Sequence, residues 1–74
     1  MTNPADIGAE NAKMAIDQGA SDDWHVALDC FDNMCDTLNE HGFRGNTEAF
    51  EEAKAAFLIV IKDYVNVSKL AGNI

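Results

Sequence analysis

Apolar residues in the middle of the chain recur at three- and four-residue steps, a spacing that places them on one face of an α-helix. That face comprises Trp24, Ala27, Leu28, Phe31, Met34, Cys35 and Leu38. We predict a helix that is capped by Ser21 and ends at His41. Gly42 suits the left-handed position after a helix end, where Phe43 would fold back onto Leu38.

A second segment with helical spacing begins after a short connection, residues 42–46. Its core face comprises Phe50, Ala53, Phe57, Val60, Tyr64, Val67 and Ala71. We predict one continuous helix that is capped by Asn46 or Thr47 and ends at Gly72. The run 55–61 alone would also fit a buried strand, but the helical spacing on both sides of it favours a helix. The short connection makes the two helices an antiparallel hairpin.

The N-terminal segment carries the signals of a shorter helix. Asn3 suits the cap, Pro4 suits the first helical position, and Gly19 follows an end near Gln18. Its thin apolar face comprises Ala5, Ala9, Ala12 and Ile16, with Ile7 and Met14 on the other side. The sequence therefore predicts an all-α fold, a three-helix bundle formed by the hairpin and this helix, in a single domain over residues 1–74.

Composition adds a strong charge to this picture. The chain has 13 acidic and 5 basic residues, a formal net charge of −8, and residues 1–42 hold nine of the acids and only one base, Lys13. Such a charge repels nucleic acid and anionic membrane surfaces, so we expect no direct binding to either. The longest apolar run has seven residues, far below the roughly 20 of a membrane-spanning helix. The N-terminus has no basic, apolar leader, which favours a cytoplasmic location.

The acids of the central helix are not spread around it. We define the acidic stripe as Asp22, Asp29, Asp32, Asp36 and Glu40, which fall within an arc of about 80° on a helical wheel. No Lys or Arg lies between Lys13 and Arg44, so like charges meet at i,i+4 and cost a few tenths of a kcal/mol per pair. A pattern that costs stability favours a functional interpretation, a docking surface for a basic protein with Trp24 as a further contact. The other interpretation, a solvated face of an acidic protein, stays open.

The stripe also suggests a more specific hypothesis. Carboxylates one helical turn apart, about 5.4 Å, have nearly the spacing of phosphates along a nucleic-acid strand. The protein would then act as a nucleic-acid mimic, an inhibitor or regulator of a nucleic-acid-binding protein.

The C-terminal helix carries a second apolar strip beside its core face, formed by Leu58, Ile61 and Val65, with Ile59 on the opposite flank. One thin N-terminal helix does not suffice to cover it, so we predict a homodimer, the commonest symmetric oligomer. The predicted interface comprises Phe57, Leu58, Ile61 and Val65. Two alternatives stay open: the N-terminal helix covers the strip, or the strip docks the protein as a structural subunit of a larger assembly.

Candidate chemistry is sparse. His25, Cys30, Cys35 and His41 are five, five and six residues apart, which does not fit a zinc site. On a helix the two cysteines point about 140° apart, with Cys35 in the core and Cys30 beside it, so they form neither a metal site nor a disulfide with each other. The acidic segment lacks the glycine and the alternating acids of a calcium loop. No nucleophile comes with a positioned His and acid, so we predict no enzyme, no metal and no cofactor.

Overall fold

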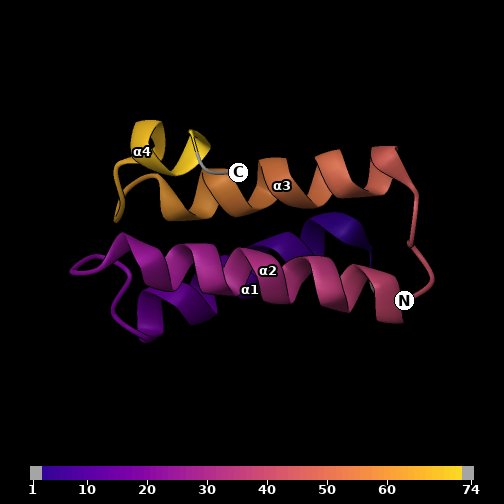
Figure 1. The fold of residues 1–74 in the computed structure, drawn as a ribbon, viewed down its shortest axis with the longest axis horizontal. Coiled ribbons are helices and arrows are strands. Elements are labelled where there is room, and N and C mark those ends of the chain that lie inside the picture. The colour runs from indigo at the N-terminus through magenta and orange to yellow at the C-terminus, as the bar shows by residue number, and fades with distance from the viewer. Residues whose placement is uncertain (1–2, 73–74) are drawn as a thin grey trace.

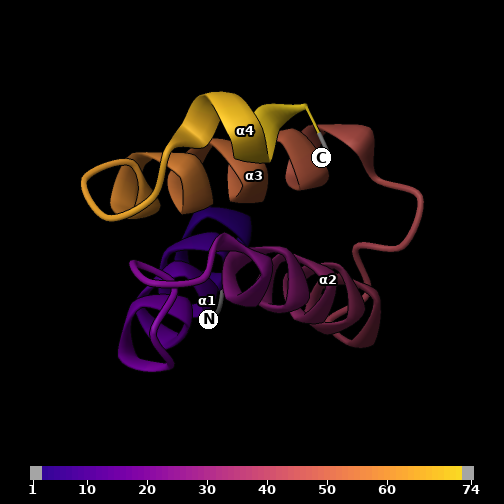
Figure 2. The same ribbon diagram turned by 60° about the vertical axis from the view of Figure 1, so that its left-hand side comes forward.

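A computed structural model describes residues 3–72, which form four helices and no strand (Figure 1). The helices are α1, Pro4–Asp17; α2, Trp24–Glu40; α3, Thr47–Ile61; and α4, Val67–Ala71. The predicted all-α class is confirmed. The turned view in Figure 2 shows α1 and α2 on one side of the molecule and α3 and α4 on the other.

The helix ends follow the local signals in the sequence. The Asn3 side chain caps α1 by accepting a hydrogen bond of 3.0 Å from the Asp6 N–H. After α1, Gly19 has a φ of 95°, and the Ala20 N–H donates to the Ala15 carbonyl at 3.0 Å. This left-handed ending provides hydrogen-bond donors for backbone carbonyls that the last helical turn would otherwise leave without a partner. The predicted bounds of the first helix are confirmed.

The end of α2 is confirmed and its start is corrected. Gly42 has a φ of 86°, and the Phe43 N–H donates to the Leu38 carbonyl at 2.9 Å, as predicted. At the other end the cap is Asp23 rather than Ser21, because the Asp23 carboxylate accepts a hydrogen bond from the His25 N–H. Ser21 belongs to the turn between α1 and α2, so the helix begins later than predicted.

Helix α1 buries a different face from the one predicted. The buried residues are Pro4, Ile7, Gly8, Asn11, Ala12 and Ala15, while Ala5, Ala9 and Ile16 are only half-buried. The reason is a close crossing with α3, where a Cβ on Gly8 would overlap the carbonyl of Ala53. Small residues on both helices permit this approach, and α3 accordingly packs more extensively on α1 than on α2.

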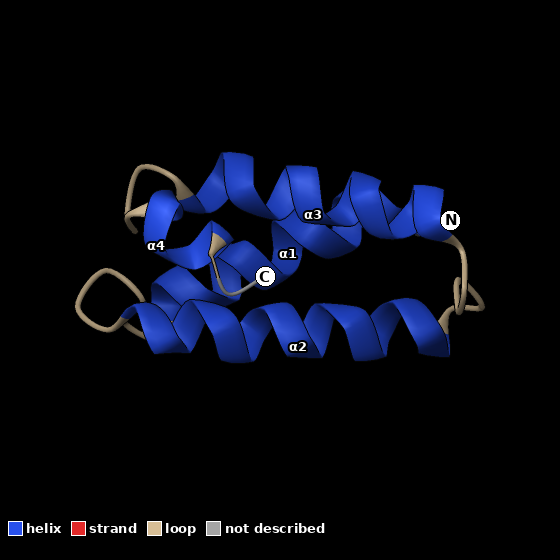
Figure 3. Cartoon of the chain, turned by 45° about the horizontal axis from the view of Figure 1, so that its top comes forward, coloured by secondary structure: helices blue, strands red, loops and turns tan. Residues whose placement is uncertain are grey.

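The two arms of the α2–α3 hairpin are held apart by aromatic rings. Phe31 of α2 makes edge-to-face contacts with Phe50 and Phe57 of α3, with ring centroids 5.9 and 5.5 Å apart. Such rings fill the space between helices without letting the backbones approach closely. Figure 3 shows α2 and α3 both running along the long direction of the molecule, with α4 and part of α1 drawn between them.

The predicted continuous C-terminal helix is wrong beyond residue 61. The chain leaves α3 after Ile61, and Asn66 caps the short α4 by accepting a hydrogen bond from the Ser68 N–H at 3.0 Å. This break turns α4 back against α2 and buries Leu70 completely. The core face is therefore Ala49, Ala53, Phe57, Ile61, Val65 and Leu70. Tyr64, predicted in the core, is 50% exposed, Ala71 is exposed, and Phe50, Val60 and Val67 are half-buried.

Candidate protein-binding surface

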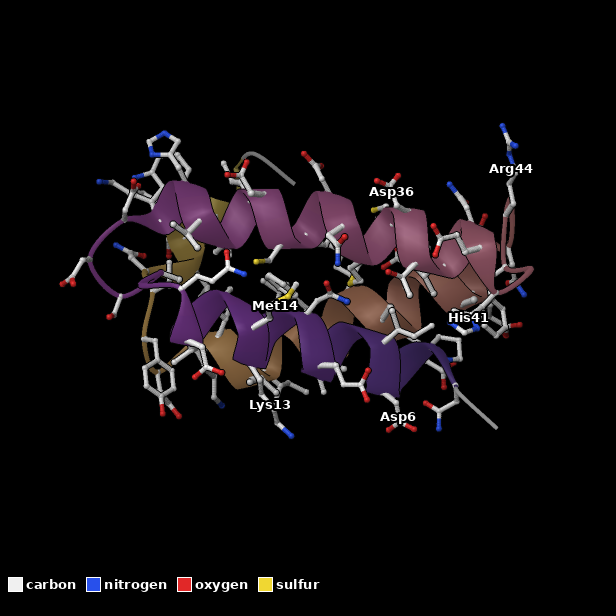
Figure 4. The ribbon with its side chains drawn as sticks, turned by 90° about the horizontal axis from the view of Figure 1, so that it is seen from below. Asp6, Lys13, Met14, Asp36, His41 and Arg44 are labelled. Carbon is white, nitrogen blue, oxygen red and sulfur yellow. The ribbon has the colours of Figure 1, made fainter. Side chains whose placement is uncertain are left out.

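The acidic stripe lies on the solvent side of α2. Ala27, Phe31, Met34 and Leu38 point into the core, which turns the opposite face of the helix outward. The carboxylate residues of that outward face are Asp29, Asp32, Asp36 and Glu40, all of them exposed. In Figure 4 the labelled Asp36 points away from α1, while Met14 of α1 lies between the two helices. The structure thus brings four of the five stripe residues onto one open helical face.

The remaining predicted contact residues lie at the start of α2. Asp22 is exposed in the turn before the helix, and Trp24, its first residue, is half-buried with its ring stacked on His25 at 4.1 Å. The Asp23 carboxylate contacts His25 Nδ1 at 3.0 Å, and the hydrogen bonds from the backbone and the ring of His25 lower the pKa of Asp23. Trp24 and Glu40 are separated by 16 residues of helix, about 24 Å, so only a partner that spans α2 contacts both.

A groove opens where α2 passes into α3. We call it the hairpin groove; it has a volume of about 260 Å³ and is lined by Cys35, Leu38, Asn39, Phe43, Gly45, Asn46, Thr47 and Phe50. The left-handed ending of α2 creates it, because Gly42 turns the chain so that Phe43 folds back beside Leu38. Sequence reasoning predicted this turn but not the groove, since the groove also needs Phe50 from the other arm.

The cysteines occupy the opposite environments from those predicted. Cys30 is buried, only 3% exposed, whereas Cys35 is half-buried on the wall of the hairpin groove. The register of α2 explains this, because Cys30 shares the buried face of the helix with Ala27 and Met34. Both cysteines are free thiols.

The pKa values of both thiols are raised. Burial raises the pKa of Cys30, and the Asp29 carboxylate adds to the effect. Burial likewise raises the pKa of Cys35, and there the carboxylates of Asp32 and Asp36 add to it. A raised pKa lowers the fraction of reactive thiolate at neutral pH, so neither residue is an activated nucleophile.

The predicted dimer residues lie mainly inside the chain. Phe57 and Ile61 are completely buried, Val65 is 7% exposed, and only Leu58 is half-buried. The alternative in which the N-terminal helix covers the strip therefore describes the structure better, since α1 packs more extensively on α3 than α2 does. On α3 the large apolar residue that faces solvent is Ile59, which is 64% exposed.

A polar pair joins the buried Asn11 of α1 to the exposed Asn33 of α2, and sequence reasoning missed it. Asn11 is 6% exposed, and its amide donates to the Ile7 carbonyl at 2.9 Å. Its side-chain oxygen accepts a hydrogen bond of 2.7 Å from the amide of Asn33. Two asparagines 22 positions apart give no recognisable pattern, so only the packing of the helices reveals them. The pair fixes how α1 and α2 are aligned along their lengths.

The potential metal ligands remain dispersed. Within residues 3–72, no three His, Cys, Asp or Glu side chains gather into a group that could hold a metal ion. None of the four described helices combines the length and the apolar character needed to cross a membrane.

Comparison with protein-family models, with curated proteins and with solved structures found no match in any of the three. Function is therefore inferred from the chain's own side chains.

Proposed function

We propose that this protein binds a basic protein partner through the outward face of α2. One observation carries the proposal: Asp29, Asp32, Asp36 and Glu40 are all exposed along this face. No Lys or Arg occurs in α2 to neutralise them. A basic surface placed against the stripe would relieve the repulsion between its carboxylates and would be attracted before contact.

A more specific version of this proposal is inhibition by mimicry. Asp29, Asp32 and Asp36 are three and four residues apart, so the rise between them is about 4.5–6 Å along the helix. A protein that binds nucleic acid through a row of Lys and Arg side chains matches such a row of charges. The partner would then be a nucleic-acid-binding protein whose binding surface α2 occupies.

The alternative function is assembly through α3, as a homodimer or as a subunit of a larger complex. The observation in its favour is the 64% exposure of Ile59, with Leu58 half-buried beside it. This surface is small, since Phe57 and Ile61 are enclosed within the chain. We therefore rank it second.

Affinity capture from the source cell at low and at high salt distinguishes the two functions. Docking through carboxylates predicts a basic partner that is captured at about 50 mM salt and released at about 500 mM, where the Debye length falls to a few ångströms. Assembly through α3 predicts a partner that resists salt and is lost when Ile59 is replaced by Glu. Capture that depends on Ile59 and not on salt would refute the proposed function.

A further inference from the structure

The hairpin groove has an apolar wall and an acidic surround. Leu38 and Phe43 meet at the turn after α2, and Phe50 faces them from α3. Cys35 and the polar residues of the connection complete the lining. Apolar side chains that line an open hollow remain in contact with water until something fills it, so filling the groove is favourable.

The size of the groove indicates what fills it. Its volume of about 260 Å³ lies below the roughly 300–1,000 Å³ of sites for small molecules and cofactors. A cavity of about 150 Å³ already accommodates a benzene ring. One large apolar side chain, such as leucine or phenylalanine, therefore fits the groove better than a cofactor does.

The charge around the groove indicates what carries that side chain. Residues 32–54, which include every lining residue, contain six acids against two bases, Arg44 and Lys54. In Figure 4 Arg44 extends away from the helices at this end of the molecule, and Asp36 also points outward. The lining itself carries no charge, but the exposed carboxylates of Asp36 and Glu40 adjoin the lining residues Cys35 and Asn39 on α2, which favours Lys or Arg beside the anchor.

We propose that the hairpin groove binds one large apolar side chain of a basic protein segment, whose flanking Lys or Arg residues contact Asp32, Asp36 and Glu40. The inference rests on the proposed function, because it assigns the stripe and the groove to the same partner. Charge attracts the segment and the groove selects its sequence. Burial of a full leucine or phenylalanine side chain corresponds to an affinity gain of about ten- to a hundredfold.

Synthetic peptides test the proposal directly. The probe has one leucine between two pairs of lysines, and the comparison peptide has serine in place of leucine. Fluorescence anisotropy measures the affinity of each peptide for the wild-type chain. We expect the leucine peptide to bind at least about tenfold more tightly than the serine peptide. We also expect it to slow the alkylation of Cys35, which lines the groove. The buried Cys30 serves as the internal reference.

Two tryptophan variants locate the binding. Asn39→Trp fills the groove from an exposed lining position, whereas Ala55→Trp adds the same side chain at an exposed position on α3 outside the lining. The preference for leucine should vanish in Asn39→Trp and persist in Ala55→Trp. The alkylation rate of Cys35 is measured on the wild-type chain, so it tests the proposal even if Asn39→Trp folds poorly.

The outcomes separate this proposal from the one on which it rests. Equal binding of both peptides, weakened when the stripe is reversed to lysine, would overturn the role of the groove and leave the proposed function intact. Peptide binding that stays unchanged when the stripe is reversed to lysine would overturn both this proposal and the proposed function.

Discussion

Two residues on α1 determine which of its faces is buried. Gly8 permits the crossing with α3, and Asn11 turns inward to meet Asn33. Neither looks apolar in the sequence, and a search for apolar spacing therefore selected the neighbouring face with Ala5 and Ala9. Glycine as a site of close approach and asparagine as a satisfied buried group become recognisable only when the partner helix is in place.

Replacement of Gly8 by Ala should destabilise the protein. The added Cβ would overlap the Ala53 carbonyl, so α1 and α3 must separate. Overpacking of this kind costs about 1–3 kcal/mol, or more against backbone, and exceeds the helix-propensity gain of about 1 kcal/mol. We expect a melting temperature several degrees lower. Gly72→Ala is the control, because its Cβ would meet no atom closer than 3.6 Å. Equal melting temperatures would show that the crossing is looser than described.

The Asn11–Asn33 pair should show measurable coupling. Asn33→Ala leaves the buried side-chain oxygen of Asn11 without its 2.7 Å partner, which costs about 1–3 kcal/mol. Asn39→Ala, an exposed position on the same helix, corrects for the change in helix propensity. In a double-mutant cycle with Asn11→Ala, urea unfolding should give a coupling energy of about 1 kcal/mol. Strict additivity would mean that the pair does not align the helices.

Whole helices were predictable where their ends are encoded locally. Asn3, Gly19, Gly42 and Asn46 act through their own backbone geometry or through an amide three residues away, so the sequence predicts these ends without knowledge of the fold. The break after Ile61 was missed because neither Gly nor Pro marks it. Burial of Leu70 against the rest of the molecule accompanies the break, and that contact is not visible in helical spacing.

Two substitutions distinguish the broken helix from a continuous one. Leu70 is completely buried, so Leu70→Ala should cost about 2–5 kcal/mol in the free energy of unfolding. Tyr64 is 50% exposed, so Tyr64→Ala should cost much less. A continuous helix with the predicted core face requires the reverse order. Thermal unfolding monitored by circular dichroism measures both.

The molecule as a whole encloses most of the strip that suggested a dimer. The sequence indicated more apolar residues than the hairpin and one thin N-terminal helix could cover, but Phe57, Ile61 and Val65 are buried within one chain, in which α1 packs closely on α3. Four of the five residues of the acidic stripe were predictable, since their positions depend only on the register of α2, whereas Asp22 lies in the turn before the helix. The hairpin groove was not, because two separate helices supply its walls.

The prediction of a homodimer was based on an uncovered apolar strip, and most of that strip is buried within one chain. We therefore expect a monomer in solution. Sedimentation equilibrium at about 50 µM should give a mass near the 8.0 kDa of one chain. A mass near twice this value, reduced to that of one chain by Ile59→Glu, would instead establish assembly through α3.

Charge reversal on α2 tests most directly whether the stripe binds the partner. One variant carries Asp29→Lys, Asp32→Lys and Asp36→Lys. A matched variant carries Glu10→Lys, Asp17→Lys and Asp63→Lys, at exposed positions outside α2. Each reversal adds two charges, so both variants change the formal net charge from −8 to −2. Both should remain folded, and the α2 variant should melt no lower than wild type at low salt, because repulsion along the helix is relieved.

The decisive quantity is the dissociation constant for the captured basic partner, measured by titration calorimetry for the wild-type chain and both variants at one salt concentration. We predict that reversal on α2 raises it more than tenfold, about 1.4 kcal/mol, while the matched reversal raises it much less. Equal dissociation constants for the two variants would show that only net charge matters. A dissociation constant for the α2 variant equal to that of wild type would show that the stripe is a solvated face and that the partner binds elsewhere.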